Sequence, residues 1–243
     1  MIRKTLGRTK QATFIVTQPD TDNNNFPTPA GTGFFISGSG YFITANHVVK
    51  AMGIGGKTDL ERPTSRFMEL IQGVELIERW PHYDLALLKA DLGKNKKKEW
   101  LKDIDQFPHL EIEFTELEEG TPAYAYGYPL SNWEVLQPSK AISIGLDHIS
   151  SRVTSAIIAS DVEYHNPVKT SGDPRFYVID KALNYGNSGG PIIVQETGKV
   201  FAACMKFQPV EIKQADGRVI MIPSLYSVAA SLSNIKEQLL PKI

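Results

Sequence analysis

The chain has 243 residues, of which 42% are hydrophobic and 22% charged, and its formal net charge is -1. This composition indicates a globular protein with a sizeable core, and the near-neutral charge argues against binding to nucleic acid or to a membrane surface. The single cysteine, Cys204, excludes an intramolecular disulfide, so we expect a reducing, cytoplasmic location. No run of apolar residues is long enough to span a membrane.

Short strands are predicted along most of the chain. Residues 12–17 form the first, and residues 33–36 and 41–44 flank a short Gly-containing loop, which is typical of a hairpin. Further short runs rich in β-branched and aromatic residues lie between turn signals at 66–72, 74–79, 84–89, 109–114, 122–127, 141–145, 151–158, 176–180, 191–195, 199–206 and 218–222. Residues 91–108 are polar and Lys-rich and predict an irregular insertion. So many short strands favour an all-β barrel or sandwich.

The C-terminal segment has a different pattern. From Leu225 onward, apolar residues recur with a period of 3.6, at Leu225, Val228, Ala229, Leu232, Ile235 and Leu239. This period predicts a helix packed on the barrel, with Ser224 as its N-cap.

One Gly-rich stretch, Gly186-Asn187-Ser188-Gly189-Gly190-Pro191, is a candidate catalytic turn. Glycines on both sides allow a serine hydroxyl to project from a tight turn beside free N–H groups. The stretch also matches G-x-S-x-G of the α/β-hydrolases, in which the acid and the histidine follow the serine. All five histidines of this chain precede Ser188, which excludes that class. The stretch alone leaves open a plain Gly-rich turn without chemistry.

Two residues supply the partners that a serine nucleophile needs. His47 stands at the end of a β-run, where a rigid scaffold presents reactive groups, and it is the best candidate for the base. Asp84 begins a strongly apolar strand, where a carboxylate needs a partner, and a histidine N–H is such a partner. His82 lies beside Asp84, but no further ligands stand at matching spacing, so no metal site is predicted.

Three stretches, at residues 44–47, 84–87 and 186–191, together resemble the trypsin/chymotrypsin-like serine proteases. Within them the chain looks most like the bacterial HtrA-type branch, without that branch's C-terminal PDZ domain. Four more stretches extend the resemblance over nearly the whole chain, at residues 31–36, 126–129, 180–184 and 222–224.

The resemblance implies a fold of two six-stranded antiparallel β-barrels with the active site between them. Residues 1–130 would form the first barrel, with His47 and Asp84. Residues 131–243 would form the second barrel, with Ser188 and a C-terminal helix.

The resemblance also implies the chemistry of a serine endopeptidase that needs no cofactor. Ser188 would attack the scissile carbonyl to form an acyl-enzyme, His47 would act as base and then acid, and Asp84 would orient His47. The N–H groups of Gly186 and Ser188 would form the oxyanion hole. Asn187 replaces the Asp that pairs with a newly cut N-terminus in digestive members, so we expect no zymogen cleavage. Regulation would instead order the loop at residues 160–177.

By the same resemblance, the pocket for the residue before the scissile bond is lined by Ala182, Leu183, Ala203, Met205 and Lys206. Ala182 stands where trypsin-like cutters keep an Asp, so a buried basic side chain would lack a counter-charge. We therefore expect cleavage after small or medium aliphatic residues.

The expected partner is a polypeptide substrate, in the narrowest case one dedicated protein, and neither nucleic acid nor a membrane. A peptide-binding module on the same fold, silent or activated by a partner, is the main alternative. A serine hydrolase that is not a protease, such as an esterase, is disfavoured by the order of the histidine and the serine.

Overall fold

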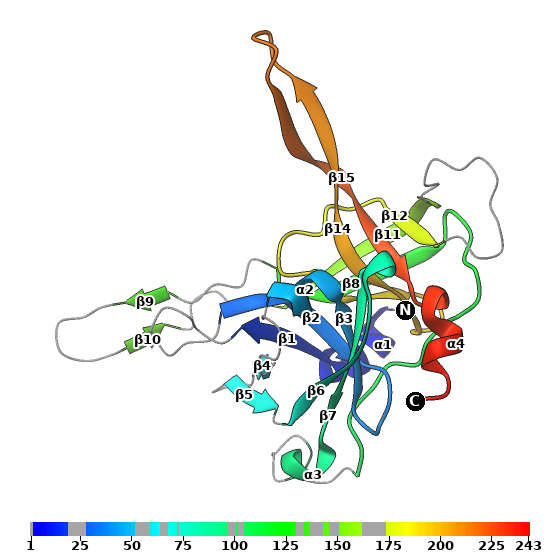
Figure 1. Cartoon of the computed structure of the whole chain (residues 1–243). Coiled ribbons are helices and arrows are strands. Elements are labelled where there is room, and N and C mark those ends of the chain that lie inside the picture. The colour runs from blue at the N-terminus through cyan, green and yellow to red at the C-terminus, as the bar shows by residue number, and fades with distance from the viewer. Residues whose placement is uncertain are drawn as a thin grey trace.

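The computed structural model describes residues 2–18, 28–51, 59–63, 68–71, 73–96, 101, 105–129, 134–136, 143–145, 151–161 and 174–243. Within these ranges the chain consists mainly of antiparallel strands with a few short helices, which confirms the all-β prediction (Figure 1). The strands of the N-terminal half are β1 (Thr13–Gln18), β2 (Thr28–Phe35), β3 (Tyr41–Ala45), β4 (Asp59–Pro63), β5 (Met68–Ile71), β6 (Val74–Trp80) and β7 (Leu85–Ala90). They are followed by β8 (Pro122–Gly127), β9 (Glu134–Leu136), β10 (Ser143–Gly145), β11 (Arg152–Asp161), β12 (Phe176–Ile179), β13 (Pro191–Val194), β14 (Val200–Lys213) and β15 (Val219–Ser231).

The strands form two main units. One is a seven-stranded sheet in the order β5-β4-β1-β2-β3-β7-β6, and the other is a closed six-stranded barrel in the order β11-β12-β15-β14-β13-β8. The barrel matches the expected six strands, whereas the first unit has one strand more than expected. Strand β8 precedes residue 130 but lies in the closed barrel. The division of the chain at residue 130 stays a prediction.

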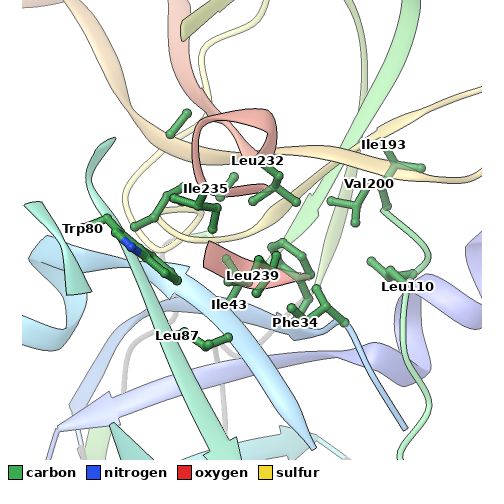
Figure 2. Close-up of a cluster of buried hydrophobic side chains, with 14 of the residues drawn as sticks. Phe34, Ile43, Trp80, Leu87, Leu110, Ile193, Val200, Leu232, Ile235 and Leu239 are labelled. Atoms are coloured by element: carbon green, nitrogen blue, oxygen red, sulfur yellow. The ribbon is translucent and has the colours of Figure 1, made fainter. Parts of the chain in front are cut away.

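A shared core joins the two units. Figure 2 shows Phe34, Ile43 and Leu87 of the sheet close to side chains of the barrel and of the C-terminal segment. The barrel contributes Ile193 and Val200, and all of these residues are at most 1% exposed. Because the two units bury apolar side chains against each other, their relative position is fixed by packing.

The predicted C-terminal helix begins later than its apolar period suggests. Residues 225–231 belong to β15, which pairs with β12 and β14, and only η3 (Leu232–Ile235) and α4 (Lys236–Leu239) are helical. Residues 227–231 are buried on both faces of the barrel strand, so small and apolar residues follow one another there, and their spacing also fits a helical period. The N-cap is accordingly Ser231, whose side chain accepts a hydrogen bond from Ser233 N, and not Ser224.

Other elements differ from the predictions as well. The N-terminal helix α1 (Ile2–Ala12) is unpredicted, and the hydroxyls of Thr5 and Thr9 bond Tyr124 Oη, each at 2.9 Å. Residues 109–114 form no strand but a single bridge to β14. The insertion at residues 91–108 contains α3 (Leu92–Asn95), and α2 (Asn46–Ala51) follows β3 directly.

Candidate active site

His47 and Asp84 meet because their strands are neighbours. Ala45 at the end of β3 pairs with Leu85 at the start of β7, so the residues just beyond this pair lie at the same end of the sheet. His47 is the second residue of the helix α2, and Asp84 follows the short helix η1 (Pro81–Tyr83). The distance from His47 Nδ1 to Asp84 Oδ2 is 2.7 Å, and His47 N donates to Asp84 Oδ1 at 2.9 Å.

The Asp84 carboxylate fixes both the position and the tautomer of His47. Because a carboxylate can only accept, Nδ1 of His47 carries the hydrogen and Nε2 carries the lone pair. The Asp84 side chain is 11% exposed, whereas that of His47 is 46% exposed and accessible to a substrate. Asp84 is also the one non-Gly residue with positive φ (51°) in the described ranges, a conformation that Asp tolerates better than most residues. The turn at Asp84 therefore aims the carboxylate at the histidine.

The turn that carries Ser188 depends on glycines and on short-range hydrogen bonds. Asn187 N donates to Asn184 O at 3.1 Å, and Gly190 N donates to Asn187 O at 2.7 Å. Gly186 and Gly189 have φ of 95° and 81°, which side chains rarely allow. A Cβ on Gly189 would in addition collide with Thr32 O, Thr44 Oγ1 and Ala45 N. Glycine is therefore required at position 189, where the turn packs against the N-terminal sheet.

Thr32 in β2 ties this turn to the N-terminal sheet. Its N–H donates to Ser188 O at 2.8 Å, and its hydroxyl donates to Gly186 O at 2.5 Å. The same hydroxyl accepts from Tyr128 N at 3.2 Å, and the whole residue is buried. Thr32 was absent from the predicted site, although it lies inside the Gly-Thr-Gly motif at residues 31–33, which was the available signal.

A pocket of about 500 Å³ brings the predicted residues together. His47, Asp84, Ser188 and Gly186 line it, and Leu183, Met205 and Lys206 contribute to its wall. Pro29, Ala30, Asn184 and Tyr185 complete the lining and were not predicted.

Two residues predicted for the pocket lie elsewhere. Ala182 is exposed and does not belong to the lining. Ala203 is 1% exposed and lies in the shared core, because it pairs with Pro191 and Ala230 inside the barrel.

The Ser188 hydroxyl has one hydrogen bond among the described residues. Its Oγ donates to Met205 O at 3.5 Å, which is a long bond, and the bond between the serine and His47 Nε2 is not made in this conformation. The N–H groups of Gly186 and Ser188 donate to no acceptor in the described part of the chain. Two neighbouring unpaired donors beside a serine hydroxyl suit an oxygen that gains negative charge.

The neutral side chain of Asn187 is fixed by burial and by one hydrogen bond. Its side chain is buried, and Nδ2 donates to Asn184 O at 3.0 Å. The absence of a zymogen switch at this position stays a prediction. Most of the loop at residues 160–177 lies outside the described residues.

Cys204 is an unreactive neighbour of the site. Burial raises the pKa of its thiol to about 12, and the negative charge of Asp84 adds to this effect. Within the described ranges, no three His, Cys, Asp or Glu side chains are grouped closely enough to hold a metal ion. No helix among the described residues has the length and hydropathy to cross a bilayer.

The class of protein follows from this arrangement. A His–Asp pair from one β unit and a Gly-flanked serine from the other line one pocket, which is the layout of the Ser-His-Asp hydrolases. A family model described as the trypsin-like peptidase domain matches residues 31–202, and the chain belongs to this family. The resemblance seen in the sequence is thereby confirmed.

Individual relatives agree with this assignment. A probable periplasmic serine endoprotease, DegP-like, of Bartonella henselae is 29% identical over 170 residues, which cover 68% of this chain and 25% of that protein. The MamO protease domain of Magnetospirillum magneticum matches with a TM-score of 0.60 and 15% identity, over 96% of this chain and 98% of that domain. The HtrA-type protease AlgW with a decapeptide matches with a TM-score of 0.64 and 17% identity, over 99% of this chain and 66% of that chain. These two structures share the fold of this chain. Among the curated relatives, the matched part of the chain spans 20% to 28% of their length.

The relatives correct the cytoplasmic location expected from the single cysteine. The relative from Bartonella henselae and two from Pseudomonas putida are named as periplasmic proteins. A lack of disulfides does not require a reducing compartment, because a chain of 243 residues buries enough core to be stable without them.

Proposed function

We propose that the protein is a serine endopeptidase that cleaves polypeptides with Ser188 as the nucleophile. The observation that carries this proposal is the pocket, which Ser188 lines together with a histidine whose Nδ1 lies 2.7 Å from Oδ2 of the Asp84 carboxylate. A serine hydroxyl is a weak nucleophile until a base removes its proton, and His47 Nε2 has the lone pair for this step.

The reaction would proceed in two stages. As a peptide carbonyl enters the pocket, Ser188 Oγ leaves Met205 O, transfers its proton to His47 Nε2 and attacks the carbonyl carbon. The oxygen of the tetrahedral intermediate accepts hydrogen bonds from Gly186 N and Ser188 N, each worth about 3 kcal/mol by analogy with measured oxyanion donors. His47 then protonates the leaving amine. In the second stage His47 activates a water, which hydrolyses the acyl-enzyme.

The pocket wall supports a preference for aliphatic residues before the scissile bond. Leu183 and Met205 supply apolar surface, while Lys206 is exposed. Asp84 is the one acid among the described lining residues, and it already bonds His47. A lysine or arginine side chain buried there would therefore lack a counter-charge.

A peptide-binding module that awaits activation is the second candidate. The long bond from Ser188 Oγ to Met205 O favours it, because the serine is not engaged with its base in this conformation. Catalytic bonds that are long in a free enzyme often shorten in the complex with substrate, so the endopeptidase remains the main proposal.

Labelling with a fluorophosphonate probe tests the two candidates. The wild type should be labelled, Ser188→Ala should not be, and Asp84→Asn should react about 10⁴-fold more slowly, because the tautomer of His47 is no longer fixed. Ser39→Ala, at an exposed serine in the β2–β3 turn, is the matched control and should be labelled like the wild type. A wild type that resists the probe with and without peptide would rule out an activated serine.

Regulation and partners follow from the same proposal. Protein trimmed at the N-terminus should be no more active than intact protein, because Asn187 cannot pair with a new ammonium group.

Ser188→Ala protein expressed in the native host should retain its polypeptide substrate, which identifies a dedicated partner if there is one.

A further inference from the structure

The two longest strands leave the barrel together as a projecting arm, defined here as residues 207–223. Strands β14 and β15 pair from Pro209 opposite Pro223 to Lys213 opposite Val219. A turn closes the arm, in which Gln214 N donates to Arg218 O at 2.8 Å. Figure 1 shows this two-stranded ribbon extending away from the rest of the chain. An isolated two-stranded ribbon is marginally stable in water, so contact with a bound partner would stabilise the arm.

One face of the arm is aliphatic. Residues directly opposite each other in an antiparallel pair share a face, and Val210 pairs with Ile222 and Ile212 with Ile220. These four side chains are between 38% and 44% exposed. The other face is mixed, because it carries the charged residues Glu211 and Lys213 opposite Met221 and Val219. We call the four-residue surface the aliphatic face.

The arm continues the wall of the active-site pocket. Met205 and Lys206 line the pocket and belong to β14, the same strand that runs out into the arm. Strand β13 accompanies β14 only as far as Ala203, and beyond it β14 pairs with β15 alone among the described strands. At about 3.3 Å per residue, Lys213 lies roughly 20 Å along the strand from Lys206. A chain bound in the pocket and running along β14 would therefore reach the aliphatic face.

The charge and size of the arm indicate what it binds. Glu211 and Lys213 balance each other, and Asp216 bonds Arg218 at 2.6 Å, so the arm has no net charge for a nucleic acid or an anionic membrane. Four partly exposed aliphatic side chains offer a few hundred Å², well below the roughly 800 Å² per partner of a stable complex between folded proteins. An apolar face of this size suits an extended segment that is also held elsewhere.

We propose that the aliphatic face docks an extended segment with aliphatic side chains in a polypeptide substrate, outside the residues that fill the pocket. This proposal rests on the proposed function, because that function supplies the second attachment point. Substrates too short to leave the pocket gain nothing from the arm, whereas longer chains are held at two sites.

Substrate length separates the arm from the pocket in a kinetic test. The test variant carries Val210→Thr, Ile212→Thr, Ile220→Thr and Ile222→Thr, since Thr keeps the β-branched shape that suits a strand. The matched control carries Glu211→Thr and Lys213→Thr on the other face. For a 20-residue peptide with an aliphatic extension, KM should rise about tenfold in the test variant and stay unchanged in the control. The ratio of this KM to that of a tetrapeptide is the measured quantity.

Several results would overturn the proposal. Equal losses for the tetrapeptide and the long peptide would mean a disturbed pocket, and an unchanged ratio would mean that the arm does not dock substrate. Wild-type dimers in sedimentation that the test variant dissociates would make the arm a self-association surface. Binding to phosphatidylcholine vesicles that the test variant loses would make it a membrane contact.

A binding measurement keeps this proposal separate from catalysis. Ser188→Ala protein is titrated into the fluorescently labelled 20-residue peptide and anisotropy is read. Binding that weakens about tenfold when the four Thr substitutions are added supports docking, even if the wild type cleaves nothing and the proposed function fails. Absent binding, or binding that the substitutions leave unchanged, refutes docking.

Discussion

Replacing Thr32 by Val removes one hydroxyl from the contact between the two halves of the site while keeping the side-chain shape. That hydroxyl donates to Gly186 O at 2.5 Å and accepts from Tyr128 N at 3.2 Å. Thr32→Val removes the acceptor in this buried hydrogen bond from Tyr128 N, and breaking a hydrogen bond to a buried group costs about 1–3 kcal/mol. Gly186 lines the pocket, so water can replace its lost donor. We expect the free energy of unfolding to fall by about 2 kcal/mol.

The effect of Thr32→Val on turnover should exceed its effect on stability. Without the anchor at its carbonyl, the Gly186 backbone would no longer be held in the orientation that the proposed oxyanion hole needs. The loss of one such donor lowers kcat by about 10²-fold or more, while KM changes little. Urea unfolding followed by tryptophan fluorescence gives the stability, and cleavage of a tetrapeptide gives kcat and KM.

Thr32→Ser is the matched control for this prediction, because it keeps the hydroxyl and loses only a methyl group. It should retain kcat within about threefold and lose about 1 kcal/mol of stability. A Thr32→Val protein with wild-type kcat, or a Thr32→Ser protein that is equally impaired, would refute the role of the hydroxyl.

Four further substitutions test the packing and charge of the site and the cost of positive φ elsewhere in the chain. Gly189→Ala should cost more than about 3 kcal/mol, because its Cβ would collide with Thr32 O and Ala45 N. Gly120→Ala, with the same φ of 81° and nothing within 4 Å, should cost about 1 kcal/mol, and thermal unfolding that ranks the two in reverse would contradict this reading. Asn187→Asp should lose about 3 kcal/mol at pH 7, because a buried carboxylate would face Asn184 O, and should recover near pH 4; urea midpoints that do not change with pH would count against it. Burial raises the pKa of Cys204 to about 12, so the unfolded thiol ionises first as pH rises above its ordinary value of 9.0. Stability should then fall by up to about 1.4 kcal/mol per pH unit between about pH 9 and 12, and a Cys204→Ala protein with the same slope would disprove this.

The sequence was most informative where chemistry depends on short motifs. The order of His47, Asp84 and Ser188 selected one arrangement among the serine hydrolases, and the structure places all three residues at one pocket. Most predicted strands lie within two or three residues of observed ones, for example 191–195 against β13 (Pro191–Val194). A strand of this kind is encoded by a short β-rich run between turn signals, so it can be predicted from neighbouring residues alone.

Features that depend on tertiary pairing were not recoverable. The apolar residues from Leu225 to Ser231 fit a helical period equally well, and only pairing with β12 and β14 decides for a strand. Thr32 gains its role from a residue 154 positions away, since its hydroxyl donates to Gly186 O. Helix α1 has little hydrophobic signal and is fixed partly through the hydroxyl contacts with Tyr124.

The contact of Thr32 with the serine turn also bears on whether the chain could cleave itself while it folds. Ser188 is synthesised late, and its turn is completed by hydrogen bonds from a strand that is synthesised much earlier. On the proposed function, a molecule in which the two halves have not docked would therefore lack a working site. During folding, loops of the same chain and of neighbouring chains would thus not meet an activated serine. On the proposed function, cleavage of the protein by its own copies would begin only after both halves have docked.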